Sequence, residues 1–241
     1  MILCADPMAI QSDLPRPLLR RMADTFLAPA AMFEDFRRGA PWVDVLVVST
    51  AVAILSVYFL PEQFFVEQMS DAVNRRGQPV DITSPPGEIA RWGRYLGMLT
   101  ALVSLPLFAL ALAAVVTLVF TVLAGVTKHF RDHLSMTSHA FLIPALGSLL
   151  AIPLQYLTGN PDAQFNPGLV LPPPASLPMI VIGGLDLFTI WMLTLISFWV
   201  GNLNPRIGFG RSAAMLLGLY LILNIVTGAL VSSHTAVVWS L

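Results

Sequence analysis

Cysteine and charged residues are scarce in this sequence. The single cysteine, Cys4, excludes a disulfide within the chain and a metal site built from several cysteines. Only 11% of the 241 residues are charged, whereas a soluble domain carries roughly 25%. The formal net charge is −1, so no overall positive field points to nucleic acid as a partner.

Sequence signatures of catalysis are missing as well. The chain has no glycine-rich phosphate-binding loop, no serine or cysteine nucleophile motif and no dense set of acids and histidines. His129 and His133 are four residues apart, as metal ligands on a helix often are, but no glutamate follows the first histidine. We expect a solvated loop there. We also predict that the protein is not an enzyme and has no metal or cofactor.

Long apolar runs are what the sequence has in abundance. Hydrophobic residues make up 56% of the chain, and most of them fall into five runs separated by short polar segments. Each run can cross a hydrocarbon core of about 30 Å, which takes about 20 helical residues. The sequence therefore predicts an all-α fold, a polytopic integral membrane bundle with five transmembrane helices. The predicted spans are residues 42–60, 97–126, 135–156, 179–201 and 212–232.

Prolines inside two of these runs predict bent helices. Pro106 lies in the second run, and Pro144 and Pro153 lie in the third. Each proline removes a backbone N–H donor and clashes with the preceding turn, so a kink or a partial break is expected. The second run is also too long for an upright span, so tilt or an extension beyond the bilayer is expected.

The N-terminal part divides into an arm and a short helix. We predict an irregular cytoplasmic arm over residues 1–22, followed by one membrane domain over residues 23–241. Residues 23–38 have the pattern of a short amphipathic helix, with apolar bulk from Phe26 and Phe33. We predict a short N-terminal interfacial helix that lies on the membrane. The alternative is that this helix packs on the protein's own spans.

The distribution of lysine and arginine predicts the orientation. With the N-terminus inside, the cytoplasmic segments hold 9 basic residues and the outer segments hold 4. Cytoplasmic loops are normally the richer in these residues. We therefore place the N-terminus in the cytoplasm and the C-terminus outside, in what we expect to be the bacterial inner (cytoplasmic) membrane.

Two polar residues inside the apolar runs are candidates for function. Asp186 lies in the fourth run, and an ionisable residue inside a span is costly and by default suggests a functional site. The alternative is that Asp186 caps a helix or ties helices together near one interface. Asn224, in the fifth run, could hydrogen-bond to a neighbouring helix or line a solute path.

Two histidines are candidates for binding a pigment or metal. His139 enters the third span, and His234 lies near the outer end of the fifth. Either could serve as an axial ligand of a cofactor such as a tetrapyrrole. The alternative for both is a hydrogen bond to a neighbouring helix.

Three short segments carry a resemblance to a known family. They are Phe26–Pro29 with Phe33, the proline-containing stretch 139–154, and the string Leu-Asp-Leu-Phe-Thr-Ile-Trp at 185–191. Together they resemble the Yip1 family of five-span membrane proteins, in its bacterial branch, over about residues 23–232. Eukaryotic relatives bind small GTPases and shape membranes, and bacterial members have no agreed activity. The resemblance implies a non-enzymatic, partner-binding membrane protein in which Asp186 is a structural residue.

The first hypothesis for function is a non-catalytic membrane scaffold or accessory subunit. It would pack against and stabilise a larger membrane assembly, bioenergetic (respiratory or photosynthetic) or transporting. Its expected partners are the lipid bilayer and other integral membrane proteins. One alternative is a small-solute permease or the membrane component of an exporter, with Asp186 and Asn224 lining its path. Another is a cofactor-bearing membrane subunit that uses His139 or His234.

Overall fold

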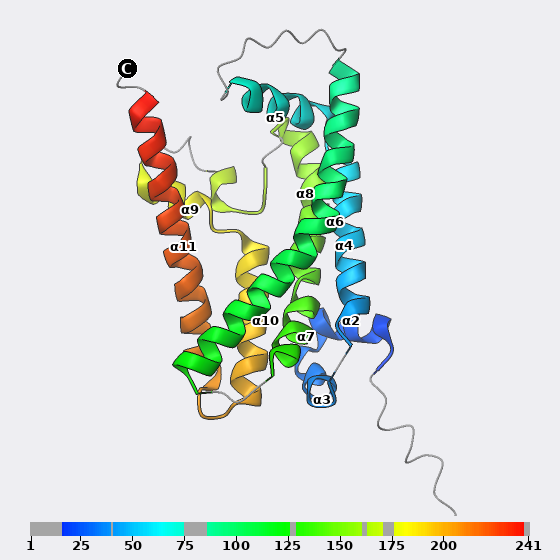
Figure 1. The fold of residues 1–241 in the computed structure, drawn as a ribbon, viewed down its shortest axis with the longest axis vertical. Coiled ribbons are helices and arrows are strands. Elements are labelled where there is room, and N and C mark those ends of the chain that lie inside the picture. The colour runs from blue at the N-terminus through cyan, green and yellow to red at the C-terminus, as the bar shows by residue number, and fades with distance from the viewer. Residues whose placement is uncertain are drawn as a thin grey trace, which may run out of the picture.

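Helices are the only regular secondary structure in the described part of the chain. A computed structural model describes residues 16–39, 41–74, 86–125, 129–160, 163–170 and 176–238. The predicted all-α fold is confirmed over these residues. The long helices run between two ends of an elongated bundle (Figure 1). They are α4 (Val43–Tyr58), α6 (Pro86–Leu118), α8 (Leu142–Thr158), α10 (Leu187–Leu203) and α11 (Gly208–Val238).

Three helical stretches are long and apolar enough to cross a membrane. They are Gly87–Val122, Phe130–Thr158 and Gly208–Leu230. Two further pairs pass the same test only when their two helices are taken together. One is Val43–Tyr58 with Glu62–Gln68, bent by 87°, and the other is Leu177–Gly183 with Leu187–Leu203, bent by 68°. The described part of the chain therefore has three to five candidate membrane-spanning helices, as expected of an integral membrane protein.

The predicted fourth span, residues 179–201, is not one helix. It consists of α9 (Leu177–Gly183) and α10, which are separated by a break at Gly184–Asp186. Asp186 has an extended backbone, with φ −77° and ψ 128°, and forms the N-cap of α10. Two consecutive glycines weaken the helix, and an aspartate competes for backbone N–H groups, so a new helix starts here. The sequence analysis did not predict this break, because the apolar run continues across it.

The third run is also divided, at the place that its first proline predicts. Helix α7 (Phe130–Ala140) has Phe141 as its C-cap, and α8 begins at the next residue, Leu142. Pro144 has no N–H to donate to the carbonyl of Ala140, so the ladder of hydrogen bonds is interrupted there. The expectation of a solvated loop at His129 and His133 is wrong for His133, which is fully buried in α7.

Helix α6 is longer than the predicted second span. It begins at Pro86 and ends in a π-helical turn, Val119–Leu123. Pro106 lies inside it, and Figure 1 shows that the helix changes direction along its length. The helix therefore begins well before residue 97, the predicted start of the span. The preceding helix α5 (Glu62–Asn74) runs across the same end of the bundle.

The N-terminal boundary differs from the prediction. Helix α2 spans Leu18–Leu27, so the predicted irregular arm is wrong for residues 18–22, and residues 1–15 lie outside the described part. Residues 23–38 do not form one helix either. Pro29 cannot donate to the carbonyl of Thr25, and the residue before a proline disfavours helical backbone. A 3-10 turn (Pro29–Ala31) and α3 (Met32–Arg37) follow instead.

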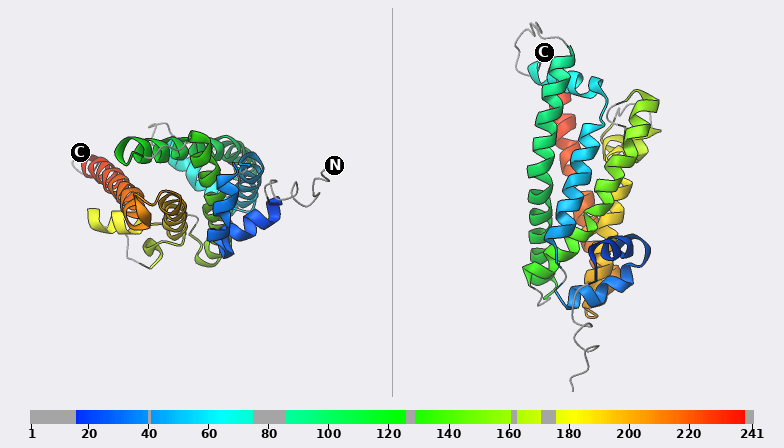
Figure 2. Two further views of the ribbon diagram at one scale, coloured as in Figure 1. Left: turned by 90° about the horizontal axis from the view of Figure 1, so that it is seen from below. Right: turned by 90° about the vertical axis from the view of Figure 1, so that its right-hand side faces the viewer.

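The core joins this N-terminal segment to the bundle. Trp199 of α10 is fully buried, and its indole N–H donates to the carbonyl of Pro29 at 2.8 Å. Phe36 packs edge-on against Trp199 and against the ring of His139. Figure 2 shows α2 and α3 against one end of the long helices. The segment therefore packs on the protein's own helices, which was the alternative to a free interfacial helix.

Candidate functional site

Asp186 caps helix α10 at the break in the fourth apolar run. Its Oδ2 accepts the backbone N–H and the hydroxyl of Thr189, both at 2.6 Å. The N–H of Asp186 donates to the hydroxyl of Tyr220 at 3.2 Å, and that hydroxyl donates to the carbonyl of Gly184 at 3.1 Å. Tyr220 belongs to α11, so one hydroxyl fastens the α9–α10 junction to the last helix.

Asn224 lies at the same junction, one turn beyond Tyr220. Its amide nitrogen donates to the carbonyl of Tyr220 at 3.0 Å. Its amide oxygen lies so close to Gly184 that a Cβ at that position would be 2.9 Å from it. The structure therefore brings the predicted residues Asp186 and Asn224 to one place, where glycine permits α11 to approach.

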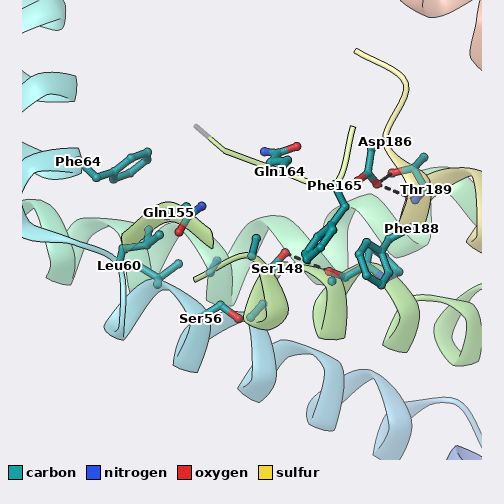
Figure 3. A pocket seen from close by; sticks show the side chains of 16 residues that line it. Ser56, Leu60, Phe64, Ser148, Gln155, Gln164, Phe165, Asp186, Phe188 and Thr189 are labelled. Atoms are coloured by element: carbon teal, nitrogen blue, oxygen red, sulfur yellow. Dashed lines mark hydrogen bonds between the residues drawn. The ribbon is translucent and has the colours of Figure 1, made fainter. Parts of the chain in front are cut away.

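A cavity of about 510 Å³ opens beside Asp186. Its walls come from α4, α5, α6, α8, α10 and the segment before α9, and three aromatic side chains, Phe64, Phe165 and Phe188, line it. We call it the chamber. Figure 3 shows its polar side chains: Ser56, Ser148, Gln155, Gln164, Asp186 and Thr189.

Packing at Gly147 shapes one wall of the chamber. A Cβ at Gly147 would lie 2.4 Å from the ring of Phe188, so only glycine lets the aromatic ring of α10 rest on α8. Phe165 packs edge-on against the same ring, with centroids 5.4 Å apart. The backbone N–H of Leu187 donates to the carbonyl of Phe165 at 3.1 Å. These contacts hold the segment around Phe165 against the α9–α10 junction.

Gln155 is the unexplained polar group of the chamber. The residue is 7% exposed, and its amide oxygen is buried with no hydrogen-bond partner among the described residues. An unpaired buried acceptor costs about 1–3 kcal/mol. Figure 3 shows Gln155 on α8 near Leu60, at the far side of the chamber from Asp186. Sequence reasoning missed this residue, although a glutamine inside an apolar run was a visible signal.

His139 belongs to a second, separate polar cluster. The ring is fully buried; its Nδ1 lies 2.7 Å from the carbonyl of Ser135, and its Nε2 lies 3.1 Å from Nη1 of Arg21. A guanidinium only donates, so Nε2 is the acceptor and Nδ1 carries the proton. Both ring nitrogens are occupied in this arrangement, which favours the hydrogen-bonded role over axial ligation. His234 lies in α11, but its side chain is outside the described residues.

Arg21 is the centre of this second cluster. Its side chain is only 2% exposed, and it forms an ion pair with Asp44 at the start of α4. It also donates to the carbonyl of Arg16 at 3.0 Å and to that of Pro41 at 2.8 Å. One guanidinium thus joins α2, α4 and α7. Sequence reasoning placed Arg21 in the irregular arm predicted over residues 1–22, because its partners Asp44 and His139 lie far along the chain.

Arg16 holds the N-terminal segment together in a similar way. Its guanidinium lies 2.7 Å from a carboxylate oxygen of Asp35 and 2.5 Å from one of Asp24. It also donates to the carbonyl of Ala31 at 2.6 Å. The hydrogen bond to Asp35 raises the pKa of Arg16 above its ordinary value. The arginine stays charged, and it anchors α2 and α3 to one another.

Candidate metal ligands do not gather in the part of the chain that the structure describes: it contains no group of three or more histidine, cysteine, aspartate or glutamate side chains placed to hold a metal ion. Comparisons with known proteins add no relative, because no protein-family model, curated protein or solved structure matches the chain. The similarity to the Yip1 family therefore stays a prediction that rests on three short sequence segments.

Proposed function

We propose that the protein is a non-catalytic integral membrane scaffold or accessory subunit that packs against a partner membrane protein through α11. In this proposal the chain crosses the membrane five times, by α4, α6, α7 with α8, α9 with α10, and α11. The N-terminus lies in the cytoplasm and the C-terminus outside. The observation that carries the proposal is the exposed face of α11.

Helix α11 is the least covered of the long apolar helices. Only 11% of the most apolar stretch of Gly208–Leu230 is buried inside the protein. Its main contacts are with α10 and α9, and Figure 1 shows it at the edge of the bundle, away from α4. In a bilayer such a face meets either lipid or another protein.

A stripe of small residues on α11 favours a protein partner. Gly210, Ala214 and Gly218 follow one another at intervals of four, and a Cβ at either glycine would meet nothing within 4 Å. On the same face of α11, the larger residues Ile222 and Val226 follow and are exposed. Without a hydrophobic driving force in lipid, small residues promote helix association because they let two backbones approach closely. The occupant we propose is one transmembrane helix of a partner protein.

The roles of the inner polar residues support the same proposal. Arg21 and His139 are engaged with one another and with the backbone, and Asp186 caps a helix. These side chains fix helices in place, as a rigid scaffold requires. The segments that resemble the Yip1 family point in the same direction, since that family is associated with partner binding.

The test is co-isolation from native membranes in mild detergent, followed by mass spectrometry and an absorption spectrum. Ala214→Leu blocks the stripe on α11, and Ala114→Leu makes the same change at an exposed position of α6. We expect wild type and Ala114→Leu to co-isolate with a stoichiometric membrane partner. The amount of partner that co-isolates with Ala214→Leu should be at least tenfold lower. A wild-type protein that is monodisperse alone overturns the proposal, and a coloured eluate favours the cofactor-bearing alternative.

A further inference from the structure

An apolar groove adjoins the chamber beside Asp186. The groove has a volume of about 470 Å³ and lies between α6 and α8. It shares four lining residues with the chamber, so the two spaces lie side by side: Ala53, Ala101, Pro144 and Ser148. The side chains at this junction are small, and two of them are alanines.

The groove has the length and lining of a site for one hydrocarbon chain. Along α6 its lining extends from Ala101 to Val115, which is about 21 Å at 1.5 Å per residue. Half of a bilayer core measures about 15 Å. Its exposed side is bordered by Phe108, which is 65% exposed.

The chamber has the polarity of a site for a head group that donates hydrogen bonds. The amide oxygen of Gln155 is a buried acceptor without a partner among the described residues. Among the described residues of the lining, Asp186 is the only one with a charged side chain, and its two hydrogen bonds with Thr189 both use one carboxylate oxygen, Oδ2. The two acceptors, on Gln155 and Asp186, lie at opposite sides of the chamber (Figure 3). They favour a head group that donates hydrogen bonds and disfavour a negatively charged one.

We propose that the chamber and groove together bind one membrane amphiphile, with an amine- or hydroxyl-bearing head in the chamber and its apolar chain in the groove. The head donates to Gln155 at one side and approaches Asp186 at the other. The apolar chain passes Ala53 and Ala101 and lies against α6. The site is distinct from the stripe on α11, and the two proposals are independent.

The experiment uses the purified full-length protein and three probes with the same twelve-carbon chain: dodecylamine, monolauroylglycerol and dodecanoate. Native mass spectrometry measures stoichiometry and relative affinity below the micelle concentration of each probe. We expect one molecule of the amine or the glycerol ester to bind at least tenfold more tightly than the anion. Equal or tighter binding of dodecanoate overturns the proposal.

Three variants locate the bound molecule. Ala101→Phe fills the junction between chamber and groove, and Gln155→Leu removes the unpaired acceptor. We expect tenfold weaker binding by Ala101→Phe and at least threefold weaker binding by Gln155→Leu. The control Ala114→Phe, on the exposed side of α6, should leave binding unchanged. If Ala101→Phe does not fold, Ala53→Leu fills the same junction from α4. Unchanged binding in both Gln155→Leu and a folded junction variant overturns the proposal.

Asp186→Asn distinguishes the two kinds of head group. Asparagine keeps the N-cap but removes the charge. It should therefore weaken the binding of dodecylamine at least fivefold and change the binding of monolauroylglycerol by less than twofold. Tighter binding of the amine to Asp186→Asn than to wild type contradicts the proposal. The variant Ala101→Phe leaves the stripe on α11 intact, so it should still co-isolate with the membrane partner. Loss of amphiphile binding with the partner retained therefore concerns the amphiphile site alone, and a failure of the scaffold proposal is seen separately, as loss of the partner by wild type.

Discussion

The guanidinium of Arg21 forms an ion pair with the carboxylate of Asp44, 23 residues further along the chain. The arginine side chain is 2% exposed, whereas that of Asp44 is 36% exposed at the start of α4. The same guanidinium reaches His139, 118 residues away. This pair therefore sets how the N-terminal helices sit on the bundle, and it supplies the first prediction.

Arg21→Leu is expected to destabilise the protein by about 2–3 kcal/mol. Removing one partner of a fully buried pair costs about 3–5 kcal/mol, and the exposure of Asp44 reduces this. The measurement is thermal unfolding in detergent, followed by tryptophan fluorescence. Arg20→Leu is the matched control, because Arg20 is adjacent and 70% exposed. Equal melting temperatures of the two variants would contradict the role assigned to Arg21.

Trp199→Phe is expected to loosen the N-terminal segment. The substitution removes the hydrogen bond to the carbonyl of Pro29, which contributes about 1 kcal/mol, and leaves a small void beside Phe36. The measurement is the rate of tryptic cleavage after Arg37 and Arg38. Trp92→Phe is the control, since Trp92 is 58% exposed. Cleavage at the wild-type rate in Trp199→Phe would refute this account of how the segment is anchored.

Two glycine substitutions are expected to act in opposite directions. A Cβ at Gly201 would lie 2.6 Å from backbone atoms of Phe209, which cannot move aside without shifting α11. Gly201→Ala should therefore destabilise the protein by about 1–3 kcal/mol through overpacking. Gly218→Ala meets open space and should stabilise it by about 0.5–1 kcal/mol, because alanine favours the helix. Thermal unfolding of both variants in detergent measures the two effects. A shift of the melting temperature in the same direction in both variants would contradict this prediction.

Asp186→Ala is expected to lower stability by about 1 kcal/mol, within the usual range for an N-cap. Asp186→Asn should remain within a few tenths of a kcal/mol of wild type, because its side-chain oxygen still accepts from the N–H of Thr189. Urea or thermal unfolding in detergent measures the difference. If the asparagine variant loses as much stability as the alanine variant, the carboxylate's charge matters more than its capping bond.

The sequence by itself determined the helical class, the membrane character and some of the interruptions. A sum of hydrophobicity along a window reports whether a segment favours lipid, and a proline removes a donor wherever it stands. Pro144 therefore marked a real break, whereas the break at Pro29, inside the helix predicted over residues 23–38, was not foreseen. Asp186 and Asn224 were also visible as polar residues in apolar runs, although their common location was not.

Only the tertiary structure decided which side chains meet. The break before Asp186 interrupts an apolar run without interrupting its hydrophobicity, so a window average passes over it. Arg21 reads as a solvated cation until Asp44 and His139, distant in sequence, are brought beside it. Gln155 is one glutamine among apolar residues until the folded chain buries it in the wall of the chamber. Burial and pairing depend on contacts between remote helices, and the order of residues along one helix does not contain them.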